Sequence, residues 1–297
     1  MEQFNSLSPA APAFAIDSSD VALDCGAAAT AINPVATPDL PLFDPARPQL
    51  KTRPLKAYRH FRELLKDKEN TEEVFKIFEA LPWKGARPRA ARFLTSPEGL
   101  AIRASEPFLP DLLDDHERLR KLPKGTVGHA YCDFMEREGL SAAGLVAESM
   151  KFRSGQPQYQ DQFTWYADRL RDTHDLLHVL TGYGRDAVGE QCVLAFTYGQ
   201  QPSPGNLFIS YLGGIEISRR LKSKAPVLRA IREAQNLGTG CPRLVEQSIL
   251  GVLAMPFDDA RRTLNITPAT QYAQVHTTWR GMGIDPYDLL APVKKAA

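Results

Sequence analysis

Two histidines and two carboxylates form a group in this sequence whose types and spacing predict metal chemistry. His174 and His178 are four residues apart, so their imidazoles would share one face of a helix. Asp175 flanks that face, and Glu190 follows after a glycine-rich reversal at residues 182–184. Two neutral imidazoles and two carboxylates carry a total charge of −2, which balances the charge of a divalent cation. Imidazole favours zinc or iron, while carboxylates also accept harder ions, so Zn²⁺, Fe²⁺, Co²⁺ and Mg²⁺ all stay open at this point.

The residues between the proposed ligands are strongly apolar. Leu176, Leu177, Val179 and Leu180 predict that this stretch is buried. Burying imidazoles and carboxylates without a partner would be costly. A bound cation would offset that cost, so the apolar flanks strengthen the metal prediction.

Several known metal arrangements can be compared with this pattern. A zincin has Glu where Asp175 stands here, and a di-iron bundle needs paired Glu-x-x-His motifs, which neither histidine provides. A phosphohydrolase of the His-Asp type would pair the helical motif with an earlier His and a later Asp. His116 or His129, with Asp186 or Asp258, could supply those residues. This arrangement therefore stays open as an alternative.

Helices must position these side chains, because helical spacing of apolar residues dominates the chain and strand-like alternation is nearly absent. A long helix over Gln158–Leu180 is expected to carry both histidines, and Gly182 and Gly184 end it. A following helix over Val188–Tyr198 would carry Glu190. Pro242 and Pro268 each mark a helix start. The pattern predicts an all-α fold, with one multi-helix domain over residues 49–297.

The first residues of the chain differ in composition from the rest. Residues 1–46 hold six acidic residues and no Lys or Arg, together with many Pro, Ala, Ser and Thr residues. No apolar periodicity runs through them. We therefore predict a disordered acidic arm over residues 1–48. It resembles neither a signal peptide, which needs an apolar core, nor a transit peptide, which needs arginine.

Composition excludes several function classes. The net charge is +1 and no basic block is present, so we expect no nucleic-acid partner. The four cysteines form no CxxC pair, which argues against a cysteine zinc site. Residues 191–215 carry no charge, but the polar turn at 199–206 divides them, so no transmembrane helix is expected. Peripheral contact with a membrane stays open.

A resemblance to a known family follows from the ligand pattern. His174-Asp175-Leu-Leu-His178, eleven further residues and then Glu190 is similar to the signature of the ubiquinone (coenzyme Q) biosynthesis protein 4 family. The run at residues 179–186 resembles the bacterial branch of this family, and the run at residues 122–131 resembles its Gly-rich segment. The resemblance implies an all-helical fold and a divalent metal, usually zinc, held by these four residues. We expect Asp175 and His178 to be catalytic, with Asp175 alternating between metal ligand and hydrogen-bond partner of His178.

The same resemblance implies a role in building the ubiquinone head group. The expected reaction is a metal-dependent, lyase-type oxidative decarboxylation at ring carbon 1 of a polyprenylated hydroxybenzoate. Expected partners are this polyprenylated quinone precursor and other ubiquinone-biosynthesis enzymes, and a homodimer is compatible with the pattern. The expected location is the bacterial cytoplasm or the periphery of the inner membrane. A non-catalytic scaffold that binds prenyl lipids and organises the other enzymes is the main alternative.

Overall fold

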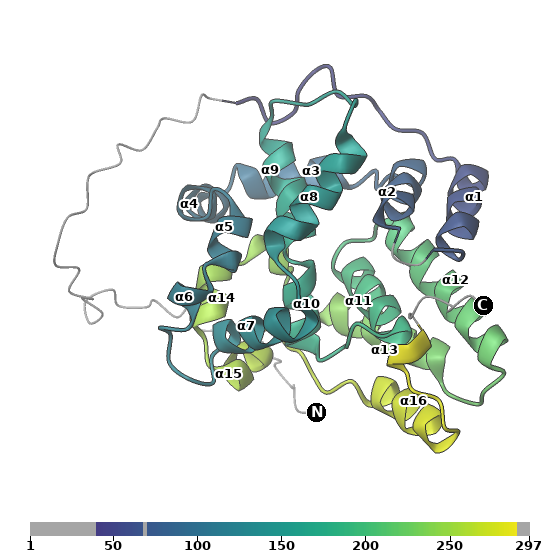
Figure 1. Ribbon diagram of the computed structural model, residues 1–297. Coiled ribbons are helices and arrows are strands. Elements are labelled where there is room, and N and C mark those ends of the chain that lie inside the picture. The colour runs from purple at the N-terminus through teal and green to yellow at the C-terminus, as the bar shows by residue number, and fades with distance from the viewer. Residues whose placement is uncertain (1–39, 68–69, 290–297) are drawn as a thin grey trace, which may run out of the picture. The chain divides into compact units, whose positions relative to one another are not determined.

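The computed structural model describes residues 40–67 and 70–289, and the greater part of the predicted arm, residues 1–39, lies outside them. Within the described residues the chain forms α-helices and short 3₁₀ helices, without a strand (Figure 1). An isolated bridge joins Thr126 and Pro256. The all-α prediction is confirmed.

The first two helices pack on a helix from the second half of the chain. They are α1 (Pro54–Leu64) and α2 (Thr71–Ala80), and their partner is α12 (Pro204–Leu221). The rings of Phe61 and Phe208 pack edge to face, with their centroids 5.7 Å apart, in the small apolar cluster that they share. This cluster fixes α12 at its N-terminal half.

Short helices fill the stretch between the first pair and the helices that carry the site. They are α3 (Ala86–Leu94), α4 (Pro97–Ser105), α5 (Leu109–Asp114) and α6 (His116–Leu119). Two longer helices follow, α7 (Val127–Glu138) and α8 (Ala142–Arg153). Frequent prolines explain the short lengths, since proline is tolerated in a first helical turn and breaks a helix elsewhere.

The predicted long helix over residues 158–180 is wrong as one element. It divides into α9 (Gln162–Asp172) and α10 (His174–Thr181) at Thr173, whose ψ is close to 0°. The Thr173 hydroxyl donates to the Arg169 carbonyl oxygen at 3.0 Å, a side-chain bond that competes with regular helix geometry. Periodicity did not reveal this break because a hydrogen bond from a threonine side chain leaves no periodic signature in the sequence.

The remaining helices complete the main core. They are α11 (Ala187–Gln200), α13 (Val227–Gly240), α14 (Ile249–Ala254), α15 (Phe257–Thr263) and α16 (Thr270–Gly281), with 3₁₀ turns at Leu244–Glu246 and Tyr287–Leu289. The helix predicted after Pro242 is therefore only a 3₁₀ turn, whereas α16 follows Pro268 as expected. α11 packs against α10, α12 and α13, and a Cβ on Gly238 of α13 would overlap the Phe196 carbonyl oxygen. α11 therefore lies at the centre of the helical packing, with its backbone in contact with the backbone of α13.

The end of the predicted arm lies against the start of α9. Arg47 forms an ion pair with Asp161 at 2.7 Å, and the backbone N–H of Asp44 donates to the same carboxylate at 2.8 Å. The Gln162 side chain donates to the Leu40 carbonyl oxygen at 2.7 Å. Residues 40–48 are thus ordered against the helical part of the chain, which the composition of the arm did not predict.

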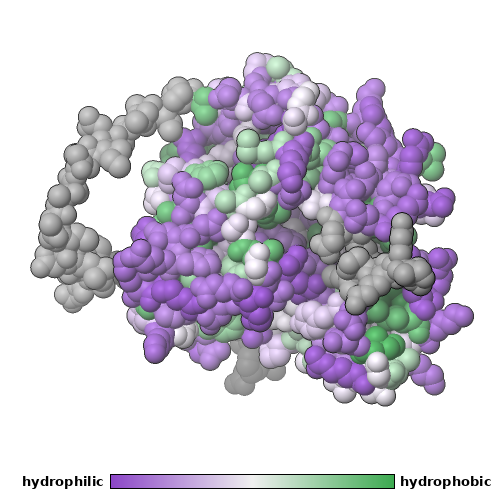
Figure 2. Space-filling view, in the orientation of Figure 1, coloured by the Kyte–Doolittle hydropathy of each residue, from purple (hydrophilic) through white to green (hydrophobic). Residues whose placement is uncertain are grey.

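The surface offers no extended apolar area in the view of Figure 2, where hydrophilic residues dominate and green patches are small and separate. Exposed apolar side chains belong to different helices, such as Leu55 on α1, Met150 on α8 and Ile215 on α12. Across the described residues, no helix is both long and apolar enough to span a bilayer.

Candidate metal centre

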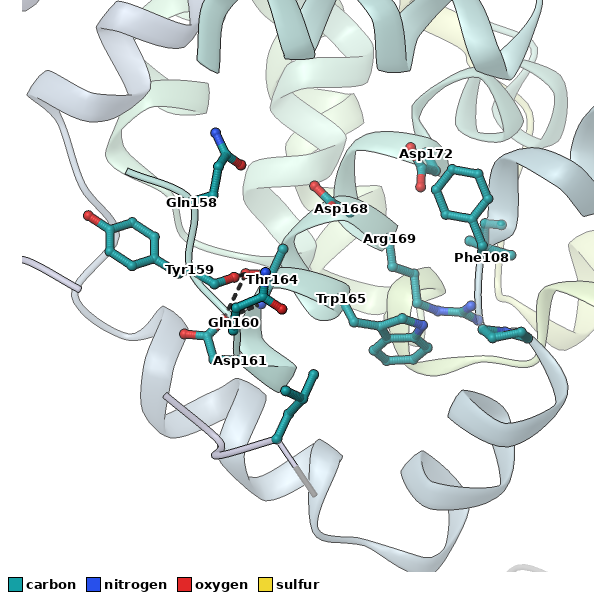
Figure 3. Close-up of a pocket in the computed structure, with 13 residues that line it drawn as sticks. Phe108, Gln158, Tyr159, Gln160, Asp161, Thr164, Trp165, Asp168, Arg169 and Asp172 are labelled. Atoms are coloured by element: carbon teal, nitrogen blue, oxygen red, sulfur yellow. Dashed lines mark hydrogen bonds between the residues drawn. The ribbon is translucent and has the colours of Figure 1, made fainter. Parts of the chain in front are cut away.

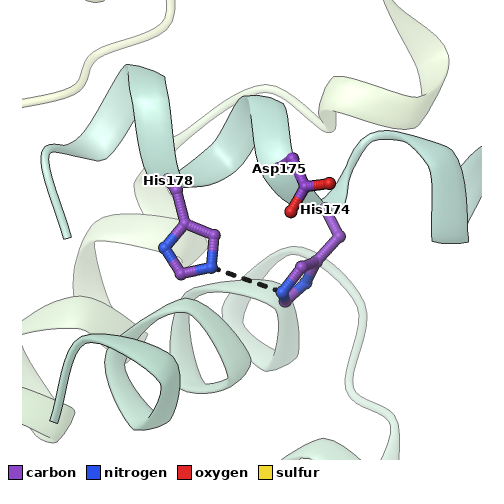
Figure 4. A group of neighbouring side chains, drawn as sticks. All are labelled: His174, Asp175 and His178. Carbon is purple, nitrogen blue, oxygen red and sulfur yellow. Dashed lines mark hydrogen bonds between the residues drawn. The ribbon is translucent and has the colours of Figure 1, made fainter. Parts of the chain in front are cut away.

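The two histidines of α10 face one another across one helical turn. The Nε2 atoms of His174 and His178 are 3.3 Å apart, and their rings meet edge to face at 5.0 Å between centroids. Figure 4 shows both imidazoles projecting from the same side of the helix, with Asp175 beside His174. The four-residue spacing therefore places two nitrogen donors at one point, as the sequence predicted.

The orientation of His178 is fixed by the backbone that ends α10. Gly182 adopts a left-handed conformation with φ of 79°, which turns the chain back toward the helix. The carbonyl oxygen of Tyr183 then accepts the Nδ1–H of His178 at 2.9 Å. Because a carbonyl can only accept, the neutral His178 ring carries its proton on Nδ1 and its lone pair on Nε2. Phe134 of α7 stacks on the ring at 5.7 Å and limits its rotation.

Glu190 reaches the two histidines from the first turn of α11. Its Oε2 atom lies 3.6 Å from Nε2 of both His174 and His178. Asp186 caps this helix, because its Oδ1 accepts the backbone N–H groups of Val188 and Gly189. The positive end of the helix dipole also stabilises a negatively charged carboxylate in the first turn.

These three donor atoms have a spacing that suits a small divalent cation. Their separations are 3.3, 3.6 and 3.6 Å. Ligands at about 2.0–2.2 Å from a tetrahedral zinc ion lie about 3.3–3.6 Å from one another. The Nε2 lone pair of His178 faces the Nε2 atom of His174 at 3.3 Å, and a cation between the two nitrogens would accept both lone pairs. The residues present therefore fit a cation such as Zn²⁺.

Asp175 is the fourth predicted ligand, and it lies close to the histidines. One of its carboxylate oxygens is within 4.8 Å of nitrogen atoms of both His174 and His178. Its side chain is largely buried against the helix. The structure thus places Glu190 3.6 Å from both Nε2 atoms and Asp175 within 4.8 Å of the histidines, but no hydrogen bond joins Asp175 to His178 among the described contacts.

The charges of the centre are coupled. Burial opposes a charge on His178, but Glu190, the Tyr183 carbonyl oxygen and Asp175 together outweigh it, so the pKa of His178 lies above its usual value. Burial would raise the pKa of Glu190, and the two histidines instead lower it below the ordinary range. Arg185 adds a positive group, with Nε 3.8 Å from Glu190 Oε1. Without a cation, the centre therefore favours a proton on His178 beside an ionised Glu190.

The residues considered for a phosphohydrolase site have other partners. His116 lies 3.3 Å from Glu136, and Nε2 of His129 is 2.8 Å from the Leu122 carbonyl oxygen. Asp186 is occupied as the cap of α11, and Asp258 is exposed in the first turn of α15. Since none of them joins the group around His174 and His178, the geometry does not favour that alternative.

Sequence reasoning missed the side chains that support the ligands. Tyr272 of α16 donates its hydroxyl hydrogen to Asp186 and accepts the backbone N–H of Gly184 at 2.9 Å. His276, one turn later on α16, lies 3.1 Å from Asp186 Oδ2. These contacts join residues about ninety positions apart, so local spacing carried no signal for them.

A separate cavity of about 360 Å³ opens beside α9 (Figure 3). Phe108 and Trp165 line it together with Asp161, Asp168 and Asp172. Its carboxylates are already paired within the chain, Asp161 with Arg47, and Asp168 and Asp172 with Arg171. The cavity therefore differs from the candidate metal centre, where two imidazole nitrogens and a carboxylate oxygen face one another.

Known proteins resemble this chain in sequence. The family model described as Coenzyme Q (ubiquinone) biosynthesis protein Coq4 matches residues 89–270, which include all four predicted ligands. "Ubiquinone biosynthesis protein coq4, mitochondrial" of Pyrenophora tritici-repentis is 33% identical over 38% of this chain and 37% of its own length. The protein of that name from Meyerozyma guilliermondii is 30% identical over 52% of this chain and 47% of its own. The chain therefore spans about half, or less, of these relatives.

A solved structure agrees with the fold. The crystal structure of a Nostoc punctiforme PCC 73102 protein superposes with a TM-score of 0.54 at 23% identity, covering 73% of this chain and all of that one. This similarity supports the helical architecture alone. The family match, by contrast, covers more than half of the chain. The chain belongs to the Coq4 family of coenzyme Q (ubiquinone) biosynthesis proteins.

Proposed function

We propose that this protein acts in ubiquinone biosynthesis as a metal-dependent decarboxylase, with a divalent cation held by His174, His178 and Glu190. The proposed reaction replaces the carboxylate at ring carbon 1 of a polyprenylated hydroxybenzoate by a hydroxyl group. The bond between the ring and the carboxyl carbon breaks with release of CO₂, water supplies the hydroxyl oxygen, and the two electrons removed reduce an oxidant such as O₂ to H₂O₂. The observation that carries the proposal is the 3.3 Å approach of the two Nε2 atoms with Glu190 3.6 Å from both.

The centre combines the features of a catalytic metal site. Bound there, a divalent cation such as Zn²⁺ would act as a Lewis acid toward the carboxylate or phenolate oxygen of the substrate. Three donors from the chain leave room for a further ligand, which is the usual composition of catalytic zinc sites. The Tyr183 carbonyl oxygen holds the His178 ring in one orientation, which is the role of a supporting hydrogen bond at metal centres.

Asp175 and Arg185 have proposed roles beside the three donors. Asp175 lies close enough to accept a proton or to orient a polar group of the substrate. Arg185 is one-third exposed and faces Glu190, so it can attract an anionic head group from solvent.

We place the protein in the bacterial cytoplasm or at the inner face of its membrane, in contact with other ubiquinone-biosynthesis enzymes. If carbonate washing of membranes failed to extract it, peripheral contact would be the wrong description.

A non-catalytic scaffold is the second candidate. Asp175 lies within 4.8 Å of the histidine nitrogens, so a small movement of its side chain would add a fourth ligand, and a closed shell of four protein ligands is typical of structural zinc. In that case the cation would only join α10 to α11. Relaxation of bulk water by Mn²⁺- or Co²⁺-loaded protein distinguishes the two, because an open position exchanges water and a closed shell does not.

Release of labelled CO₂ tests the catalytic proposal directly. The purified protein, loaded with Zn²⁺, Co²⁺ or Mn²⁺, is incubated aerobically with a short-prenyl 4-hydroxybenzoate labelled in its carboxyl group. We expect CO₂ release and a hydroxylated ring product from the wild type. The His178→Ala protein should release no more CO₂ than wild-type protein from which the metal has been removed. His116→Ala is the matched control, because His116 contacts Glu136 away from the centre. A folded, metal-free His178→Ala protein with wild-type CO₂ release would remove the cation from the mechanism.

A further inference from the structure

The loop between α10 and α11 joins the two sides of the metal centre. Tyr183 supplies the carbonyl oxygen that holds His178, and Asp186 caps the helix that carries Glu190. Gly184 and Arg185 connect them. The position of this short loop therefore decides how His178 and Glu190 approach each other.

Helix α16 holds this loop through one tyrosine hydroxyl. The Tyr272 hydroxyl accepts the N–H of Gly184 and donates to Oδ2 of Asp186, so it joins both ends of the turn. The rings of Tyr272 and Tyr183 also pack edge to face, with their centroids 5.3 Å apart. Space around the turn is filled, since a Cβ on Gly184 would overlap the Tyr287 hydroxyl.

His276 lies beside the same carboxylate on the next turn of α16, at ion-pair distance but without a hydrogen bond from its Nε2 atom. Its Nε2 lies 3.1 Å from Asp186 Oδ2, and its ring packs on Tyr272 at 4.4 Å between centroids. Asp186 is fully buried, so its charge depends on these partners and on the backbone N–H groups of α11. The buried carboxylate thus connects α16 to the first turn of α11.

We infer that Tyr272 and His276 are positioning residues for the metal centre, acting on His178 through Gly184 and Tyr183 and on Glu190 through Asp186. This inference rests on the proposed metal site, but its first consequence concerns the protein without metal. Loss of the Tyr272 hydroxyl leaves the Gly184 N–H unpartnered and frees the turn to move. The Tyr183 carbonyl then holds His178 less well, and the Nδ1–H tautomer of His178 loses its preference.

The test compares Tyr272→Phe with Tyr211→Phe. Tyr211 donates its hydroxyl to Gln235 at 2.7 Å between α12 and α13, so this control also removes one partly buried hydrogen bond. In metal-free protein, at a pH high enough for the His178 ring to be neutral, ¹⁵N shifts of His178 should show mixed tautomers in Tyr272→Phe and the wild-type tautomer in Tyr211→Phe. Zinc affinity, measured with a competing chelator, should fall about 10–100-fold in Tyr272→Phe, as for other supporting groups at metal sites, and less than about twofold in the control.

A second pair of variants covers the case in which Tyr272→Phe does not fold. His276→Leu should weaken zinc binding, and His276→Gln should restore part of it, because an amide can donate to Asp186. If His276 only stabilised the fold, both variants would melt at a lower temperature and would bind zinc with equal affinity. The inference is overturned if the folded variants keep both the His178 shifts and the wild-type zinc affinity. If the wild type itself binds no zinc, the ¹⁵N shifts still decide whether α16 positions His178, so the two failures are distinguishable.

Discussion

A Cβ atom on Gly189 would overlap the carbonyl oxygen of Gly184, so the first turn of α11 lies directly against the loop that follows α10. This contact between backbones brings Glu190, the next residue, within reach of the two histidines. A side chain at position 189 would push the two segments apart. The close approach therefore links the packing of the fold to the geometry of the centre.

Replacement of Gly189 by alanine should damage both stability and metal binding. Overpacking of this kind costs roughly 1–3 kcal/mol of unfolding free energy, since the obstacle is backbone that cannot rotate away. Urea unfolding and a zinc titration measure the two effects. Gly251→Ala is the control, because a Cβ there meets only ordinary contacts in α14, and it should be neutral or stabilising. Equal zinc affinity in Gly189→Ala and the wild type would contradict the proposed role of this contact.

The ion pair between Arg47 and Asp161 predicts a pH-dependent contribution to stability. Burial alone would raise the pKa of Asp161, but Arg47 and nearby N–H groups lower it to about 2 from 3.8. A carboxylate whose folded pKa is lowered stabilises the protein above its unfolded pKa, and this contribution disappears as the pH falls from about 4 toward 2. Its size is about 2 kcal/mol.

Unfolding of Arg47→Gln at several pH values tests this contribution. The variant should be less stable than the wild type at pH 6, and the difference should shrink as the pH approaches 3. Arg262→Gln removes an exposed pair with Asp259 and should change stability little at any pH. A difference between Arg47→Gln and the wild type that stays constant with pH would show that packing, and not charge, holds residues 40–48 in place.

Metal binding should compete with a proton on His178. The pKa of His178 is raised because Glu190, the Tyr183 carbonyl oxygen and Asp175 together outweigh the effect of burial. A ligand must lose that proton, so zinc affinity should fall as the pH drops through this raised pKa. Calorimetry in two buffers of different ionisation enthalpy measures the protons released. Glu190→Gln removes the charge that raises the pKa, so its proton release near neutral pH should be smaller. Equal release in both proteins would contradict the coupling.

Much of the centre could be predicted from sequence because its main determinants are local. The spacing of His174 and His178 on one helix, and the glycines after it, already fix where the two nitrogens point. The fold class followed from apolar periodicity for the same reason. The break at Thr173 was missed, since a side-chain bond to Arg169 leaves no periodic signature. The support from Tyr272 was also missed, because only the folded chain brings α16 to the loop.

Zinc binding by the purified chain tests the central claim most directly. Titration of metal-free protein against a chelating dye should give one tightly bound ion per chain for the wild type and for His116→Ala. His178→Ala should lose that ion because it removes one of the three closest donors, and Glu190→Gln should bind it more weakly, since the amide keeps an oxygen donor without the charge. The result that would contradict the account is a folded His178→Ala protein that binds one zinc ion as tightly as the wild type.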